Sequence, residues 1–330
     1  MKKSIKRIVA ICLAVVLVGT VFAACSSKDN ESGTNKDSYK IGIAQWEDHP
    51  ALNAATEGFK KAVEDKLGAD KVDFEYNTAQ GETTNCSTIV NRYAANKVDL
   101  IMANATPVVQ SAVSATKEIP IVGTSVTEYG VALGIENFSG KTGNNVTGTS
   151  DLAPLDQQAA MIKEICPDTK TVGIVYCSGE PNSKYQATEV TKYLADLGIK
   201  ATEYPFADSN DLQSIATKAV SENDALYVPT DNVAAKNTGI IDAVARPAKT
   251  PVFAGEEGIA KGCGIVTLTI SYYDIGYAAG EMAAQILAEG KNPADMEIRY
   301  APQFTKKYNA EICKELGISV SDDFVALDAE

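Results

Sequence analysis

The hydrophobic residues of this chain follow two alternating patterns from Tyr39 onward. Short runs rich in β-branched residues, typical of strands, alternate with amphipathic stretches of ten or more residues, which are typical of helices. We therefore predict an α/β fold in which parallel strands are joined by helices. The predicted strands cover residues 40–45, 72–77, 100–104, 119–125, 171–176, 200–204, 225–229 and 251–254. The predicted helices cover residues 51–67, 84–96, 107–116, 155–165, 184–197, 212–220, 233–245 and 272–288.

The number of strands favours two lobes over one. Eight strand–helix units in roughly 290 residues exceed what one compact core usually holds. Residues 131–151, dense in Gly, Asn and Ser, separate the first four units from the next four and are predicted to be the hinge. Each half then forms its own open parallel sheet. A ligand is expected beyond the carboxyl ends of the strands, where helix N-termini point.

The first 25 residues have the layout of a cleaved secretory signal. Four basic residues, the last of them Arg7, precede an apolar run over 8–21 and the sequence FAAC at 22–25. A helix of about 14 residues spans only ~21 Å, short of a ~30 Å bilayer core, so cleavage is favoured over a membrane span. The small residues before Cys25 resemble a lipobox, which predicts removal of residues 1–24 and acylation of the Cys25 thiol. Secretion with cleavage after Ala24 is the alternative, and both place the protein outside the cell.

The composition beyond the signal is polar and acidic. Residues 26–38 contain no large apolar side chain, so residues 25–38 are predicted to be a flexible tether. The whole chain has 30 basic and 43 acidic residues and a net charge of −13; removing residues 1–24, with four basic and no acidic residues, leaves −17. No basic stripe with interleaved aromatic residues follows Arg7, so nucleic acid is not expected as a partner.

Several kinds of chemistry lack the residues they need. The chain has one His, no Cys-x-x-Cys pair and no Asp-rich calcium loop, so no metal or other cofactor is predicted. A Ser-His-Asp triad would have to use His49, which precedes a proline, and no Gly-x-Ser-x-Gly turn accompanies it, so an enzyme is not expected. Beyond Cys25, the cysteines are predicted to be small buried side chains, with a disulfide between Cys166 and Cys177 left open. They are Cys86, Cys166, Cys177, Cys263 and Cys313.

The first predicted strand is followed by QWEDHP at 45–50, which holds the only Trp and the only His of the chain. Trp46 either stacks on a flat ligand or caps the core of its own lobe. His49, at a probable helix start, is expected to have a structural or capping role. The pair Glu256-Glu257, which also follows a strand, is expected to be a solvated loop.

The two halves differ in the polar residues that follow their strands. Hydroxyls and predicted helix N-termini follow strands of the first half at 104–107 (NATP) and 124–128 (TSVTE). Acidic and amide groups follow strands of the second half at 177–183 (CSGEPNS) and 230–232 (TDN). This division suits a dipolar ligand, whose carboxylate needs N–H and O–H donors and whose ammonium needs a carboxylate.

Several segments resemble, in order and spacing, one family: the ABC-transporter substrate-binding lipoproteins of the tryptophan and tyrosine uptake type, with the type I periplasmic-binding fold. The resemblance extends over about residues 40–293. Each segment alone is weakly specific, and their joint order carries the resemblance. The matching segments are 45–53 (QWEDHPALN), 105–107, 126–128, 145–148, 176–183, 229–232, 272–280 (YYDIGYAAG) and 286–287.

The resemblance implies two lobes that close over a free amino acid, often aromatic, and deliver it to a membrane permease and its ATPase. It implies lobe 1 at 39–151 plus 272–291, lobe 2 at 152–271 plus 292–330, and a monomer that meets the membrane only through its N-terminal lipid. It also implies a set of site residues, in which the first lobe supplies hydroxyls, the second supplies acidic and amide groups, and the Trp stacks on the ligand or closes the cleft. The set is Trp46, Thr106, Ser125, Thr127, Glu180, Asn182, Ser183 and Asp231.

Other readings of the same pattern stay open. Glu128-Tyr129 stands where many relatives carry Asp-Pro, so that loop departs from the family pattern. A nucleoside or sugar receptor of the same fold is one alternative, and a surface adhesin is another.

Overall fold

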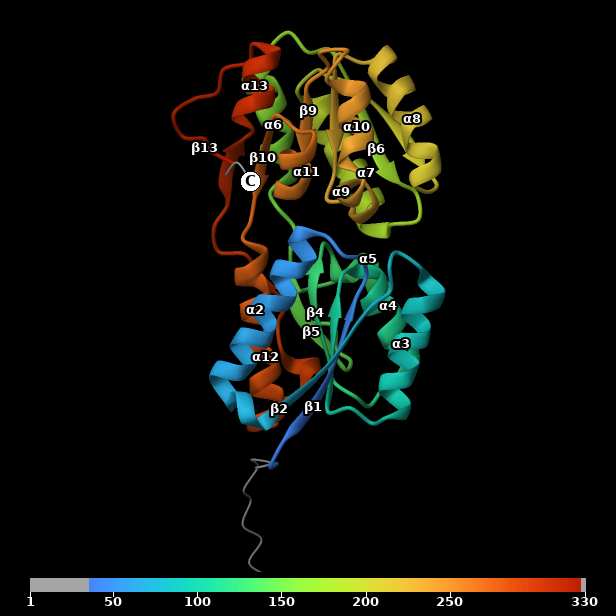
Figure 1. Ribbon diagram of the computed structural model, residues 1–330, viewed down its shortest axis with the longest axis vertical. Helices are drawn as coiled ribbons and strands as arrows, with labels where there is room; N and C mark the ends of the chain where they lie inside the picture. The colour runs from blue at the N-terminus through green and yellow to red at the C-terminus, as the bar shows by residue number, and fades with distance from the viewer. Residues whose placement is uncertain (1–35, 328–330) are drawn as a thin grey trace, which may run out of the picture. The chain divides into compact units, whose positions relative to one another are not determined.

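The computed structural model describes residues 36–327, which form two sheets covered by helices (Figure 1). The predicted signal peptide at 1–24, the lipidated Cys25 and most of the tether at 25–38 lie outside the described residues. Between residues 36 and 327 no helix combines the length and the hydropathy needed to cross a bilayer.

The first sheet has six parallel strands in the order β11-β5-β4-β3-β1-β2. One face is covered by α3 and α4, whose apolar residues form a core with those of the strands, and the other face is covered by α2 and α12. The strands are β1 (Tyr39–Gln45), β2 (Val72–Thr78), β3 (Leu100–Asn104), β4 (Ile121–Val126), β5 (Val146–Ser150) and β11 (Arg299–Tyr300). The helices are α2 (Pro50–Leu67), α3 (Thr83–Ala95), α4 (Thr106–Ala115), α5 (Tyr129–Leu133), α12 (Tyr272–Glu289) and the short η1 (Ala69–Lys71) and η2 (Pro293–Asp295).

The second sheet has seven strands in the order β13-β12-β10-β9-β8-β6-β7. Only β10 and β12 run antiparallel among its described pairs. The strands are β6 (Thr171–Cys177), β7 (Lys200–Phe206), β8 (Ala225–Val228), β9 (Val252–Ala254), β10 (Val266–Thr269), β12 (Thr305–Tyr308) and β13 (Val325–Ala326). The helices are α6 (Leu155–Ile165), α7 (Pro181–Asp196), α8 (Ser209–Glu222), α9 (Asn232–Lys236), α10 (Thr238–Ala245), α11 (Glu257–Gly262) and α13 (Ala310–Leu316).

All eight predicted strands are confirmed, and the two-lobed α/β class with them. The prediction that residues 131–151 form the hinge is wrong for most of this range, and the first crossing between the sheets follows only at its end, after Ser150. These residues contain the end of α5 and the buried strand β5, which pairs with β4. The strand was missed because a glycine interrupts its pattern of β-branched residues. Gly148 has φ 151°, and a Cβ there would overlap the carbonyl oxygen of Gly123 on β4.

The chain passes between the sheets three times, after β5, after β10 and after β11. The family resemblance implied that residues 292–330 belong to the second lobe, but Arg299 pairs with Thr149 of β5. Arg299–Tyr300 therefore belongs to the first sheet, and the last crossing follows it. The pairing is only two residues long, too short to leave a hydrophobic pattern in the sequence.

Helices α2 and α12 pack with their backbones in direct contact. A Cβ on Gly276 would overlap the carbonyl oxygen of Ala55, and a Cβ on Gly58 would overlap that of Tyr273. Glycine at these positions lets the two helices approach more closely than any side chain would allow. The start of α12, where the chain has just returned from the second sheet, is thereby fastened to the first lobe.

Candidate functional site

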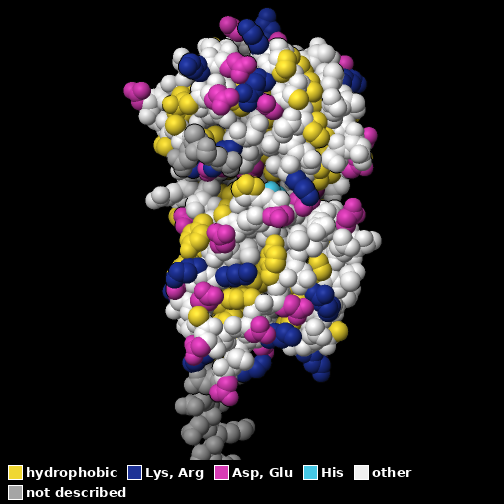
Figure 2. Space-filling view, in the orientation of Figure 1, with side chains coloured by type: hydrophobic (Ala, Val, Ile, Leu, Met, Phe, Trp, Pro, Cys, Tyr) yellow, Lys and Arg dark blue, Asp and Glu magenta, His cyan; other side chains and the backbone are white. Residues whose placement is uncertain are grey.

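The carboxyl ends of the strands in the two sheets face each other, and side chains of the two lobes touch there. His49 Nε2 lies 3.2 Å from Asn232 Oδ1, and Lys236 Nζ lies 2.8 Å from Glu47 Oε1. Figure 2 shows the single histidine of the chain between the two halves. The lobes are therefore closed on each other. The expected structural role of His49 takes the form of this contact, since its side chain does not cap α2.

The first lobe brings hydroxyls to this interface on a strained backbone. Ala105 and Ser125, which lie at the ends of β3 and β4, have φ values of 91° and 55°. Positive φ is uncommon for residues other than glycine and costs energy. The hydroxyls of Thr106 and Ser125 are buried and have no hydrogen-bond partner within the described part of the chain. Because an unpaired buried polar group costs about 1–3 kcal/mol, these two groups mark a place where a ligand can bind.

The second lobe brings carboxyl groups that its own backbone already engages. Asp231 accepts hydrogen bonds from the backbone N–H of Cys177 at 2.6 Å and of Ala234 at 2.8 Å, and so caps α9. Glu180 accepts from the backbone N–H and the side-chain amide of Asn232, at 3.0 and 2.7 Å. Burial raises the pKa of Glu180 to about 8 and also raises the pKa of Asp231.

Asn182 and Ser183 lie at the start of α7, beside these carboxyl groups. The Asn182 amide donates to Glu180 Oε2 at 3.1 Å and to the Thr230 carbonyl at 3.0 Å, while its own oxygen is buried without a partner among the described residues. The Ser183 hydroxyl is fully buried and directed at the same Thr230 carbonyl at 3.4 Å. Asn182 therefore offers an acceptor toward the other lobe, whereas Ser183 contacts its own lobe.

Thr127 links the rim of the first lobe to two partners. Its hydroxyl donates to Asp151 Oδ1 at 3.1 Å and lies 3.3 Å from the amide nitrogen of Gln186 on α7, across the interface. Asp151 also accepts from the Tyr272 hydroxyl at 3.1 Å. Burial raises the pKa of Asp151 to about 6. Hydrogen bonds from Thr127 to Asp151 and from Tyr272 to Asp151 therefore connect the segments in which the chain crosses between the sheets after β5 and after β10.

Sequence reasoning missed two carboxyl groups of this interface. Glu256 was expected in a solvated loop, and this is wrong: only 2% of its surface is exposed, because it caps α11 by accepting from the N–H groups of Gly258 and Ile259. Burial raises the pKa of Glu256 to about 7. Asp151 was not predicted as a site residue because it follows β5, which the sequence pattern assigned to the hinge. Glu256 directly precedes α11, and an acidic residue beside the first N–H groups of a helix is favoured by the helix dipole; this signal could have identified it.

A small cavity of about 10 Å³, room for roughly one water molecule, lies between the lobes. Ser125, Asn182 and Asp231 of the predicted set line it, together with Asp151 and Glu256. The residues described around it include three carboxyl groups and neither Lys nor Arg. His49 adds no fixed charge, because burial lowers its pKa. We call this the central cavity. It favours a cationic group and is too small for an amino acid in the closed arrangement.

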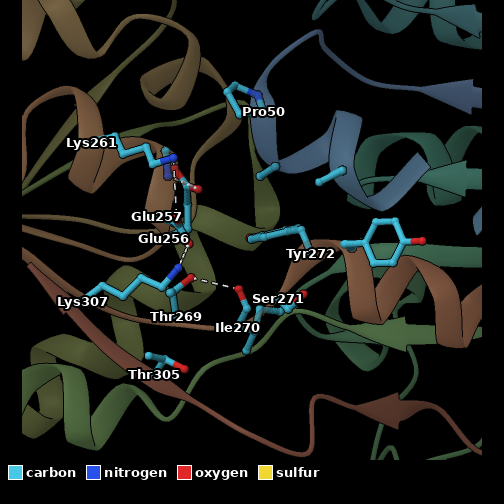
Figure 3. Close-up of a pocket in the computed structure, with 14 residues that line it drawn as sticks. Pro50, Glu256, Glu257, Lys261, Thr269, Ile270, Ser271, Tyr272, Thr305 and Lys307 are labelled. Atoms are coloured by element: carbon cyan, nitrogen blue, oxygen red, sulfur yellow. Dashed lines mark hydrogen bonds and ion pairs between the residues drawn. The ribbon is translucent and has the colours of Figure 1, made fainter. Parts of the chain in front are cut away.

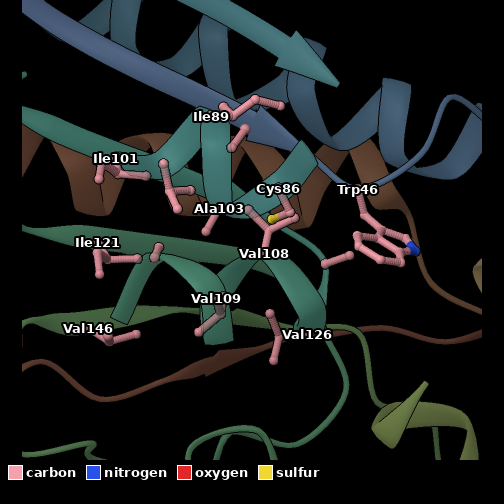
Figure 4. Close-up of a cluster of buried hydrophobic side chains, with 14 of the residues drawn as sticks. Trp46, Cys86, Ile89, Ile101, Ala103, Val108, Val109, Ile121, Val126 and Val146 are labelled. Carbon is pink, nitrogen blue, oxygen red and sulfur yellow. The ribbon is translucent and has the colours of Figure 1, made fainter. Parts of the chain in front are cut away.

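A larger cavity of about 430 Å³ adjoins the interface and is lined by Trp46 and Glu180 of the predicted set, with Cys177. Trp46 is 5% exposed and lies at one edge of the core of the first lobe, with its ring nitrogen turned away from that core (Figure 4). That nitrogen has no hydrogen-bond partner within residues 36–327. The ring therefore caps its own core and offers one polar atom. Cys166 and Cys177 are both free thiols.

Residues 40–330 match the sequence profile of a family described as ABC transporter substrate binding protein. The chain belongs to this family. The resemblance inferred from its segments is confirmed.

This substrate-binding protein is similar over most of its length to proteins with stated ligands. It is 34% identical over 302 residues to a tyrosine-binding protein of Clostridioides difficile (strain R20291), covering 89% of this chain and 87% of the relative. Its structure superimposes with a TM-score of 0.83 on an ABC domain in complex with L-Trp from Streptococcus pneumonia, at 30% identity, covering 86% and 96% of the two chains. The type I periplasmic-binding fold is confirmed.

A third comparison bears on the arrangement of the lobes. A substrate-binding protein with adhesive properties from Clostridium difficile, in its ligand-free, open structure, is 34% identical and covers 88% of this chain and 100% of its own. Its TM-score is only 0.68, although its identity is higher than that of the tryptophan complex. A rotation of one lobe against the other lowers the TM-score when whole chains are superimposed. The difference agrees with the direct contacts between the lobes of this protein.

Proposed function

We propose that this protein is the extracellular, lipid-anchored receptor of an ABC importer, and that it binds a free aromatic amino acid between its lobes by hinge closure. The observation that carries the proposal is the set of buried, unpaired polar atoms on the facing rims: the Thr106 and Ser125 hydroxyls on one lobe and the Asn182 amide oxygen on the other. The tyrosine-binding relative and the tryptophan complex support an aromatic ligand.

The charges of the two rims support a definite orientation of the ligand. Hydroxyls and the start of α4 offer donors on the first lobe, so the ligand carboxylate binds there near Thr106 and Ser125. The central cavity supplies carboxyl groups without a basic partner, so the ammonium group binds near Asp231 and Glu256. The side chain then extends toward the larger cavity beside Trp46.

Binding requires the lobes to separate and close again. The central cavity of about 10 Å³ cannot admit an amino acid. The ligand therefore enters an open form, and it stabilises a closed form in which both rims contact it while standing farther apart than in this arrangement. The closed protein then presents one surface to the permease, which with its ATPase completes uptake. Acylation of Cys25 would keep the receptor at the outer face of the membrane.

Ligand analogues with one charged end test the proposal directly. The full chain is titrated calorimetrically with tyrosine, tryptophan, phenylalanine, leucine, uridine and glucose, and with tyramine and 3-(4-hydroxyphenyl)propionate, which lack the carboxylate and the ammonium group of tyrosine. We expect both analogues to bind at least tenfold more weakly than tyrosine. An aromatic amino acid at 100 times its Kd should also raise the free energy of unfolding by ~2.7 kcal/mol. Binding of uridine or glucose, with no response to any amino acid, would overturn the ligand assignment.

The anchor has its own test. Cells that express the full chain and the Cys25→Ala variant are fed an alkyne-tagged fatty acid, and the label on the receptor is measured. Label on the wild-type chain and none on the variant supports acylation at Cys25. A released, unlabelled wild-type chain that begins at Cys25 would favour ordinary secretion instead.

An adhesive role is a second candidate, because the 34% identical relative is described as a substrate-binding protein with adhesive properties. Adhesion through the outer surface would leave the cleft free, so the two roles can coexist. Adhesion of beads coated with this protein to host cells, measured with and without saturating tyrosine, distinguishes a surface role from one that depends on the closed cleft.

A further inference from the structure

A second cavity, of about 330 Å³, lies beside two of the crossing segments (Figure 3). We call it the hinge cavity. It is lined by the start of α2 on the first lobe, by α11 and β12 on the second, and by the segment from Thr269 to Tyr273 that joins them. Its volume falls in the range of small-molecule sites. The hinge cavity shares Glu256 and Tyr272 with the central cavity, but none of the site residues predicted from the sequence lines it.

One side of the hinge cavity is apolar and the other side carries two ammonium groups. Pro50, Ala54 and Ile270 supply the apolar part. On the other side, Lys261 and Lys307 share one carboxylate: Lys307 Nζ lies 2.6 Å and Lys261 Nζ 3.6 Å from oxygens of Glu257. Figure 3 shows both ammonium groups meeting at this single acid. Each ammonium has three donors, so Lys261 in particular retains donors for an anion.

Glu256 changes this charge balance little. It also lines the cavity, but its oxygens accept hydrogen bonds from the N–H groups that begin α11. Both oxygens of Glu256 are thus taken by backbone donors, whereas Lys261 and Lys307 share Glu257 alone. A carboxylate with an apolar tail matches both sides of the cavity.

The hinge cavity is coupled to the central cavity by a shared wall. Glu256 and Tyr272 line both cavities, and the Tyr272 hydroxyl donates to Asp151, which lies at another crossing of the chain. Pro50, Ala54 and Tyr272 belong to the α2–α12 pair, whose backbones are in contact, whereas Lys261 and Lys307 belong to the second lobe. A rotation of the lobes therefore changes the distance between the two sides of the hinge cavity.

We propose that the hinge cavity binds a small monocarboxylate with an apolar tail, and that its occupancy favours the closed lobes and so tightens amino-acid binding. A ligand that contacts both sides binds the closed arrangement more strongly than one in which the sides have moved apart. The coupling rests on the proposed amino-acid function, whereas binding in the hinge cavity does not.

The probe is phenylacetate, compared with its neutral twin phenylacetamide. Calorimetry with the full chain, free of amino acid, is expected to show phenylacetate binding and at least tenfold weaker binding of phenylacetamide. Ala54→Trp fills the apolar side and should abolish the phenylacetate signal, while Glu57→Trp on the exposed face of the same helix should preserve it. Lys261→Met should weaken phenylacetate binding, and Lys218→Met, on the exposed face of α8, should not.

The coupling is measured separately. Saturating phenylacetate should lower the Kd for tyrosine by roughly fivefold or more, the lower end of typical allosteric coupling, and Ala54→Trp should remove this effect. Absence of phenylacetate binding, or binding that survives Ala54→Trp, would overturn the hinge-cavity site. A third outcome separates the two claims. If Ala54→Trp abolishes phenylacetate binding, but phenylacetate does not change the Kd of the wild-type protein for tyrosine, the site is retained and the coupling is overturned. If no amino acid binds, the proposed function fails, while the Ala54→Trp comparison still decides the site.

Discussion

The two rims of the cleft hold polar groups in opposite ways. On the first lobe, Thr106 and Ser125 keep buried hydroxyls without partners, on a backbone with positive φ at Ala105 and Ser125. On the second lobe, Glu180 and Asp231 are already surrounded by backbone and amide donors of their own lobe.

This difference separates binding from folding. Groups that lack partners lower the stability of the lobe that carries them and gain their partner only from a ligand. Groups that cap helices stabilise their own lobe, and they bind a ligand only with the hydrogen-bond acceptor positions that the cap leaves free. Substitutions on the first rim should therefore affect binding without loss of stability, whereas substitutions on the second rim should affect both.

The largest effect is expected on the second rim, at Asp231. Asp231→Ala removes a buried carboxylate and a helix cap, so we expect amino-acid binding to weaken by ~2–5 kcal/mol and the free energy of unfolding to fall by ~1–2 kcal/mol. Calorimetry and urea unfolding measure the two quantities. Asp231→Asn retains a capping oxygen and should recover the stability without the affinity. Wild-type affinity in Asp231→Asn would remove this carboxylate from the site.

On the first rim, Ser125→Gly should separate binding from stability in the opposite direction. Glycine accepts φ 55° freely, and the substitution removes an unpaired hydroxyl, so we expect the free energy of unfolding to rise by about 1 kcal/mol. Tyrosine binding should weaken by ~1–3 kcal/mol, because the ligand loses a hydrogen bond. Ser214→Gly, in exposed α8, is the control and should lower stability without changing affinity. Unchanged tyrosine affinity in Ser125→Gly would contradict the assigned role of this rim.

The second rim should also respond to pH. The folded pKa values of Glu180 and Glu256, about 8 and about 7, lie above the ordinary value of 4.5. The folded chain thus binds more protons than the unfolded chain, and its stability should be highest below pH 4.5 for these groups and fall as pH rises to about 8. Urea unfolding at pH 5 and pH 8 tests this. Glu180→Gln should flatten the dependence, and Glu118→Gln at an exposed position should leave it unchanged.

Ligand binding should release part of the protons that these carboxyl groups take up on folding. An ammonium group near Glu256 and Asp231 favours their charged forms, so binding releases protons and tightens as pH rises from 6 to 7, by at most about tenfold for one proton. Calorimetry in two buffers of different ionisation enthalpy counts the protons. Net proton uptake on binding would place the ammonium group elsewhere.

The smallest effect is expected where the rims meet directly. Lys236 is 47% exposed at its side chain and pairs with the buried Glu47 across the interface. Lys236→Met should weaken amino-acid binding by only ~0.2–1 kcal/mol, mainly through faster release, because exposed ion pairs contribute little. Stopped-flow release of tyrosine measures this effect, with Lys218→Met as the control. A loss as large as that of Asp231→Ala would mean that direct contacts, and not the ligand, hold the lobes together.

The sequence predicted the fold better than the site, for a physical reason. A buried strand such as Leu100–Asn104 carries its own hydrophobic pattern, which needs no knowledge of its neighbours. Strand β5 has no such pattern, because Gly148 is dictated by the approach of Gly123 on another strand. The burial of Glu256 likewise depends on a cap and a crossing segment that a linear pattern does not display.

Individual site residues show the same limit. The pattern after the strands led to Ser125, Asn182 and Asp231, which line one cavity, because parallel strands must end at one edge of a sheet. It left open whether Trp46 stacks on a ligand or caps its own core, because its 5% exposure depends on the packing of α3 and α4. The roles of the predicted residues in binding remain predictions for the variants above to test.

The direct backbone contact between α2 and α12 has a consequence for the order in which the molecule can be made. Positions 55 and 276 meet across most of the chain length, and α12 shares with α2 the cover of one face of the first sheet. During synthesis that face is only partly covered until the last fifth of the polypeptide has emerged, and such distant pairings form slowly. Export before folding, as the proposed function requires, would benefit from this delay, because the core of the first lobe stays incomplete until α12 has been made.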